Sequence, residues 1–89
     1  MLHKEDIASL LVFDGNMLSR GYATLRIVVR SRNSETGTIT FSSEGETQTF
    51  AVTPEYQEYV VTLPMHKNEF FGFEINATVD TIVGDYETL

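Results

Sequence analysis

The sequence of 89 residues has no cysteine and no tryptophan, and it has only two prolines and two histidines. Without cysteine the chain can form no disulfide and can offer no thiolate ligand to zinc. His3 and His66 stand far apart in the sequence, whereas a transition-metal site needs several clustered nitrogen or sulfur ligands. Stability therefore has to come from the packing of one modest core.

Basic residues are also scarce. Six Lys and Arg stand against thirteen Asp and Glu, which gives a net charge of −7. Residues 1–34 hold five basic and three acidic residues (net +2), and residues 35–89 hold one basic and ten acidic residues (net −9). An acidic surface repels phosphate backbones, so we expect no nucleic-acid partner. The charge fits simple solubility, docking to a basic partner, or mimicry of nucleic acid.

No hydrophobic run is long enough to cross a membrane. The N-terminal segment carries Lys4, Glu5 and Asp6 before a short apolar run, which is not the pattern of a signal peptide. We therefore expect no membrane partner and a cytoplasmic or virion location.

What the sequence does contain is alternation of apolar and polar residues. Between residues 22 and 30 the apolar residues recur with a period of two, as in a half-buried strand. The predicted inward set is Ala23, Leu25, Ile27 and Val29. Similar short segments, separated by turn-forming residues, lie at 38–41, 47–52, 56–63, 69–77 and 81–83. This spacing predicts one all-β domain over residues 1–89, a small antiparallel β-sandwich of six to eight strands. Jelly-roll and immunoglobulin-like connectivity both fit this strand pattern.

Glycines and the N-terminal segment refine this prediction. Gly45 suits a hairpin turn with a positive φ, and Gly84 suits a β-bulge in the last strand. Near the N-terminus, Ile7, Leu10 and Leu11 fit one face of a helix, but "SLLVF" before the turn "DGN" fits a strand equally well. We favour a strand there because the rest of the chain predicts β-structure.

The order of features "FDGN", "GYATLRIVVRS", "GTITFSSEGE", "YQEYVVTL", "FFGFEI" and "VDTIV" resembles that of galactose-binding-like jelly-roll domains, which include many carbohydrate-binding modules. The resemblance implies that Tyr56 and Tyr59 occupy mid-domain aromatic positions and that Asp80 and Ile82 belong to the closing strand. The chain is shorter than usual for that family, and it lacks the tryptophan that commonly stacks on a sugar ring. The resemblance therefore concerns the fold more than the ligand.

No set of residues predicts catalysis or a cofactor. Ser42 and Ser43 lie in a predicted turn, without the sequence context of a nucleophile and with no histidine nearby. Calcium is the only metal with candidate ligands, because carboxylate and amide oxygens stand near predicted strand ends, although without the tight spacing of a calcium loop. These candidates are Asp14, Asn16 and Asp80, with Asp85 and Glu87 further along. We expect a protein that is not an enzyme.

Several residues are candidates for a binding surface. Tyr22, Arg26 and Arg30 share the polar side of the strand at 22–30, and Arg and Tyr are favoured at interface hot spots. The alternative for the two arginines is pairing with acidic residues on a neighbouring strand. Phe70 falls on the opposite side from the core residues around it and is a candidate for a subunit contact. Tyrosines that offer ring faces to a sugar are Tyr22, Tyr56, Tyr59 and Tyr86.

These observations predict a non-catalytic β-sandwich that acts by protein–protein assembly, through self-association or docking to a larger structure. A small accessory protein of a phage virion, in the capsid or tail, is one such setting. Two alternatives stay open: a carbohydrate-binding module, and a small acidic inhibitor or nucleic-acid mimic.

Overall fold

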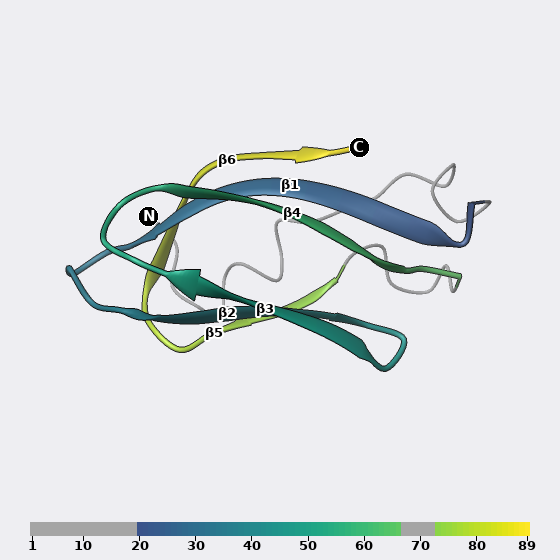
Figure 1. The fold of residues 1–89 in the computed structure, drawn as a ribbon, viewed down its shortest axis with the longest axis horizontal. Helices are drawn as coiled ribbons and strands as arrows, with labels where there is room; N and C mark the ends of the chain where they lie inside the picture. Colours follow the sequence, from purple (N-terminus) through teal and green to yellow (C-terminus); the bar gives the residue numbers. More distant parts are fainter. Residues whose placement is uncertain (1–19, 67–72) are drawn as a thin grey trace.

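The computed structural model describes residues 20–66 and 73–89. In these ranges the chain forms six strands in two three-stranded sheets that lie face to face (Figure 1). The strands are β1 (Tyr22–Ser31), β2 (Gly37–Ser43), β3 (Glu46–Val52), β4 (Gln57–Pro64), β5 (Glu74–Ala77) and β6 (Thr81–Thr88). The prediction of a small all-β sandwich is confirmed. No helix in the two described ranges is long and apolar enough to span a membrane.

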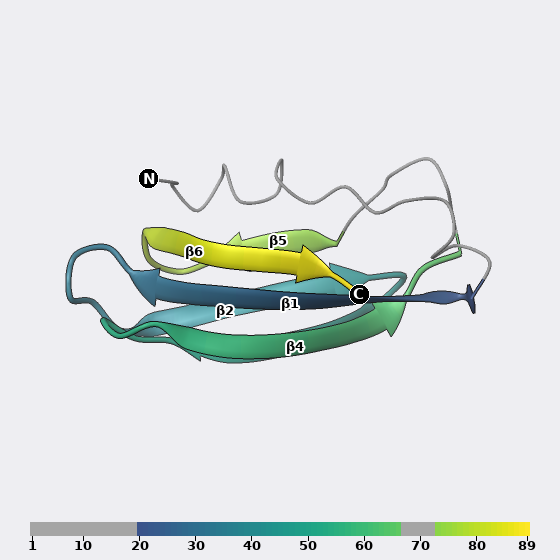
Figure 2. The ribbon, with the colours of Figure 1, turned by 90° about the horizontal axis from the view of Figure 1, so that it is seen from above.

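Each sheet is built around a central strand. The first sheet has the order β4-β1-β6 and the second has the order β3-β2-β5, and every neighbouring pair is antiparallel. Figure 2, which views the molecule from above, shows the three strands of the first sheet side by side. Apart from the β2–β3 hairpin, each connection leads from one sheet to the other. The two sheets are therefore linked repeatedly by the chain itself.

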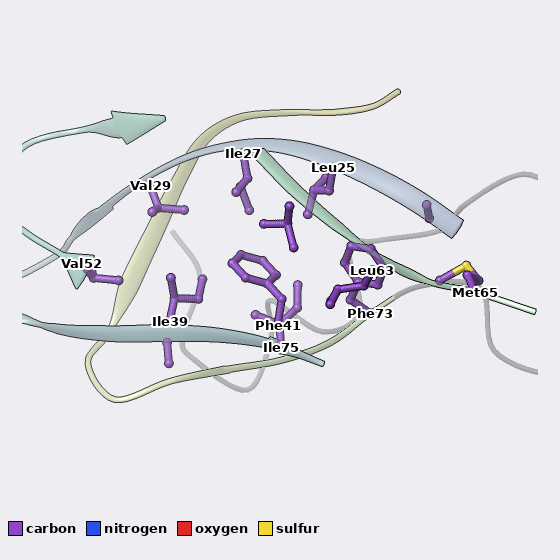
Figure 3. Packing of buried hydrophobic residues seen from close by; sticks show 13 residues of the cluster. Leu25, Ile27, Val29, Ile39, Phe41, Val52, Leu63, Met65, Phe73 and Ile75 are labelled. Carbon is purple, nitrogen blue, oxygen red and sulfur yellow. The ribbon is translucent and has the colours of Figure 1, made fainter. Parts of the chain in front are cut away.

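The core follows the predicted alternation. The predicted inward residues of β1 are at most 1% exposed, and Phe41 of β2 is fully buried between the sheets (Figure 3). Burial of one such large side chain contributes about 1.5–3 kcal/mol. Around Phe41 lie Leu25 and Ile27 of the first sheet and Ile39 and Ile75 of the second. A single hydrophobic cluster thus holds both sheets together.

The predicted turn glycine and bulge are both present. Gly45 lies in the β2–β3 hairpin with φ of 85°. In β6, Val28 of β1 lies opposite Asp85 and Val29 lies opposite Val83, so Gly84 is the extra residue of a β-bulge. Strand β6 extends to Thr88, beyond the predicted 81–83. The strand predicted before "DGN" lies outside the described residues.

Side chains close one long side of the sandwich, between edge strands β3 and β4. The hydroxyl of Tyr59 donates a hydrogen bond to the carbonyl oxygen of Ala51 at 2.7 Å, and Nε2 of Gln48 donates to the carbonyl oxygen of Thr62 at 3.0 Å. The ring of Tyr59 also stacks on Phe50, with centroids 4.6 Å apart. Groups of one sheet thus occupy backbone acceptors of the other.

One end of the sandwich is joined by Glu44 and His66. The Glu44 carboxylate accepts a hydrogen bond from the backbone nitrogen of His66. Its other oxygen lies 2.8 Å from Nδ1 of the His66 ring. The ring of His66 lies against Gly21, where a Cβ atom would be 2.7 Å from Nε2. Gly21 also has φ of 81°, which favours glycine. The pair of Glu44 and His66 connects the β2–β3 hairpin to the segment that follows β4.

Candidate functional site

The outer surface of the first sheet gathers the arginines and tyrosines that the sequence suggested. Because side chains alternate along a strand, the residues between the buried ones point outward, and the register places them in rows across the three strands. This surface, here called the arginine face, consists of Tyr22, Thr24, Arg26, Val28 and Arg30 of β1, Glu58, Val60 and Thr62 of β4, Ile82, Asp85 and Glu87 of β6, Leu89, and the ring of Tyr56.

Arg26 occupies the centre of the arginine face. Its guanidinium pairs with Glu58 of β4 at 3.1 Å and with Asp85 and Glu87 of β6 at 2.6 and 3.4 Å. Its side chain is 24% exposed, whereas the three carboxylates are 57–64% exposed. One guanidinium thus bridges all three strands, which is the pairing with neighbouring acidic residues that the sequence allowed.

The contacts of Arg26 shift two protonation equilibria. Hydrogen bonds, first to Asp85 and then to Glu58, raise the pKa of Arg26 above its usual value. The hydrogen bond from Arg26, followed by its charge, lowers the pKa of Asp85 below the usual 3.8. A group whose charged form is favoured by a neighbour stays ionised over a wider pH range. Arg26 and Asp85 therefore each keep their charge over a wider pH range.

Tyr56 is held on the arginine face although it lies in the β3–β4 connection. Its ring lies under the guanidinium of Arg30, 5.4 Å from the ring centroid. It also covers Gly84, where a Cβ atom would be 2.6 Å from Cε1 of the ring. Gly84 therefore supplies the space that the ring needs, and Tyr56 is fixed at one end of the face while 49% exposed.

A second stacked pair lies at the other end of the arginine face. The guanidinium of Arg20 lies 4.8 Å from the centroid of the Tyr22 ring, and Nη2 of Arg20 donates to the carbonyl oxygen of Leu89 at 3.0 Å. The backbone nitrogen of Leu89 donates to the carbonyl oxygen of Thr24 at 2.9 Å. These bonds place the C-terminal leucine beside β1, so an arginine–tyrosine pair stands at each end.

Exposed apolar side chains also concentrate on this face. Within residues 20–66 and 73–89 five large hydrophobic residues are strongly exposed, and four of them belong to the arginine face. These four are Val60 (54%), Tyr56, Leu89 and Tyr22, and the fifth is Tyr86. Sequence reasoning missed Val60 and Leu89. The signal for Val60 was present, because it stands between two inward residues of β4 and must therefore point outward.

The outer surface of the second sheet has a different character. It consists of Thr38, Thr40 and Ser42 of β2, Thr47, Thr49 and Ala51 of β3, and Glu74 and Asn76 of β5. The hydroxyls of Thr40 and Thr49 lie 3.0 Å apart across the two strands. Of the residues that make up this threonine face, Glu74 is the charged one, and none is a large hydrophobic residue.

The structure brings together four of the six predicted binding residues. Tyr22, Arg26, Arg30 and Tyr56 all lie on the arginine face. Tyr59 does not join them, because its ring lies on the inner side of β4 against Phe50. Phe70 lies outside the described residues.

The predicted calcium ligands are not gathered in the described part of the chain. Asp14 and Asn16 fall outside it, and Asp80 lies in the turn between β5 and β6, where its carbonyl oxygen accepts a hydrogen bond from the backbone nitrogen of Arg32 at 3.0 Å. Asp85 and Glu87 pair with Arg26. Among residues 20–66 and 73–89 no group of three or more His, Asp or Glu side chains is placed to hold a metal ion.

No known protein family, curated protein or solved structure matches this chain. The resemblance to galactose-binding-like domains stays a prediction.

Proposed function

We propose that the protein is a non-catalytic β-sandwich module that assembles with another protein through the arginine face. The observation that carries this proposal is the location of the exposed hydrophobic residues, four of which share this one surface with three arginine–aromatic or arginine–carboxylate clusters. Arg and Tyr are the residue types that most often dominate binding energy at interfaces. Exposed apolar side chains grouped on one surface favour contact with a partner.

The size of the face fits this role. A stable interface buries about 800 Å² on each partner. The principal dimensions of the molecule are 40 × 22 × 18 Å, and the sheet surface seen in Figure 2 spans the longest and the shortest of them, so it offers an area of this order. The setting that we propose is an accessory role in a phage virion, in the capsid or tail. The sequence suggested this setting because it predicts a stable β-fold without an active-site set.

The test compares one substitution on each face. Val60→Asp places a charge on the arginine face, and Ala51→Asp places the same charge on the threonine face; both positions are exposed and lie on edge strands. We expect Val60→Asp to weaken assembly at least tenfold and Ala51→Asp to leave it unchanged. Self-association is measured by sedimentation over a range of concentrations, and heterologous assembly by quantitative co-purification from cells of the source organism. Equal behaviour of the two variants in both assays would contradict the proposal.

A second candidate function is glycan binding at Tyr56. The ring contacts Arg30 and Gly84 and remains half exposed, and an exposed tyrosine side chain held in place is a suitable contact for a sugar. A glycan panel read by tyrosine fluorescence tests this candidate, with Tyr56→Ala as the control. The third alternative, an acidic mimic, gains no support, because described acidic residues lie on both faces and in the hairpin at one end.

A further inference from the structure

The centre of the arginine face combines apolar surface with exposed carboxylates. The register places Glu58, Val28 and Asp85 in one row across the three strands. The backbones of the two carboxylate-bearing residues are two strand spacings apart, about 9–10 Å, with Val28 on the strand between them. The guanidinium of Arg26 lies between the two carboxylates. Val60 and Ile82 adjoin Val28 on either side, in the neighbouring rows. An apolar diagonal therefore runs between negatively charged side chains.

The charges at this centre are not balanced. Three carboxylates share the single guanidinium of Arg26, so the group keeps a net negative charge. Each carboxylate side chain remains more than half exposed and can accept further hydrogen bonds from outside. Arg30 and Arg20 stand toward opposite ends, where each is stacked on a tyrosine. The face is thus negative in the middle and positive toward its ends.

This pattern disfavours a second copy of the chain as the occupant. In a symmetric face-to-face dimer each subunit presents the same patch to the other. If the patch centres meet, the row with Glu58 and Asp85 faces its own copy, and juxtaposed like charges oppose association. The net charge of −7 on each copy adds to this repulsion.

Resting on the proposed function, we infer that the partner is a different protein that presents a lysine or arginine, flanked by apolar residues, to the centre of the arginine face. The aliphatic stem of the basic side chain packs on Val60, and its charged head pairs with the exposed outer side of the Glu58 and Asp85 carboxylates, which hold the guanidinium of Arg26 between them. Lysine and arginine suit such a place because their methylene stems cover apolar surface while the head stays among polar groups. The flanking apolar residues contact Tyr22 and Tyr56.

The probes for this inference are three acetylated and amidated pentapeptides that differ at the middle position: Leu-Val-Lys-Val-Leu and its Gln- and Glu-centred counterparts. Each is titrated into the ¹⁵N-labelled full-length protein, and amide shifts are followed by NMR. We expect the Lys-centred peptide to shift amides around Val28, Val60 and Asp85. It should bind at least threefold more tightly than the Gln-centred peptide, and the Glu-centred peptide should bind most weakly.

Two variants with the same change in net charge complete the test. Glu58→Gln removes a carboxylate from the arginine face, and Glu74→Gln removes one from the threonine face. Glu58→Gln should weaken binding of the Lys-centred peptide about two- to fivefold, the usual range for an exposed ion pair, and Glu74→Gln should leave it unchanged. Equal effects of the two variants, or equal binding of all three peptides at Val60, would overturn the inference of a basic partner. The proposal that the arginine face is a docking surface would then still stand.

Two other outcomes bear on both proposals. If no peptide shifts the arginine face, the inference is wrong, and the Val60→Asp assay alone then decides the proposed function. If the chain forms dimers that Val60→Asp disrupts, the docking surface is supported and the different partner is wrong.

Discussion

The two outer faces of the sandwich share one core and one strand pattern, yet their chemistry is opposite. The arginine face carries long side chains that reach from strand to strand, with Arg26 contacting both neighbouring strands. The threonine face carries short side chains, and the hydroxyls of Thr40 and Thr49 pair across two of its strands. Outward positions therefore contribute little to the choice of fold and are available for recognition. Of the two faces, the arginine face has the features of an interface.

The largest expected effect tests whether both faces depend on the common core. Phe41→Ala removes the ring that lies between the sheets, and we expect a loss of about 3–5 kcal/mol in the free energy of unfolding. Urea denaturation followed by tyrosine fluorescence measures the loss. Because both sheets contact Phe41, NMR shifts should change on both faces. Changes confined to the second sheet would show that the two faces are supported separately.

A smaller effect is expected where a loop residue meets the arginine face. Gly84→Ala places a Cβ atom in the position of the Tyr56 ring, which has to move, and we expect a loss of about 1 kcal/mol. A double-mutant cycle with Tyr56→Ala identifies the cause. In the Tyr56→Ala background the Gly84→Ala substitution should cost almost nothing. An undiminished loss would mean that the backbone of the bulge itself requires glycine.

The ionic network of the arginine face predicts a dependence on pH. Arg26 lowers the pKa of Asp85 below 3.8 in the folded protein, so between the two pKa values the unfolded chain binds more protons. The stability from this pair is complete above the unfolded pKa and is lost as the pH falls through the folded one. The unfolding temperature of the wild type should therefore fall more steeply below pH 3.8 than the unfolding temperatures of the Asp85→Asn and Arg26→Gln variants. Parallel curves for all three proteins would contradict this assignment.

The smallest effect is expected on the threonine face. Thr49→Val removes one hydroxyl of the pair with Thr40 but keeps a β-branched side chain that suits a strand. The free energy of unfolding should change by no more than about 0.5 kcal/mol, as for most surface substitutions. A loss above 1 kcal/mol in urea denaturation would show that the hydroxyl pair stabilises the sheet, and it would weaken the contrast between the faces.

Local patterns in the sequence were sufficient to predict much of the fold. Alternation identified the buried side of β1, and the glycines at 45 and 84 marked a turn and a bulge. These features depend on residues close together in the chain. Which strands pair was beyond such reasoning, because β1 pairs with β6 across more than half of the chain.

The candidate site was predictable only in part, for the same reason. Tyr22, Arg26 and Arg30 share one side of a single strand, so their grouping follows from its period. The contact of Tyr56 with Gly84 depends on a connection that crosses between the sheets, and no local sequence pattern predicts this contact. The pairing of Glu44 with His66 likewise joins distant segments, so nothing in the sequence indicated it.

The side-chain bonds between β3 and β4 have a consequence for the behaviour of the protein at high concentration. Exposed edge strands offer free backbone groups on which other chains can add and aggregate. Tyr59 and Gln48 occupy carbonyl groups of Ala51 and Thr62 along these two edges, so an incoming strand would first have to break bonds that already exist. This side of the sandwich is thereby protected against the uncontrolled growth of its sheets.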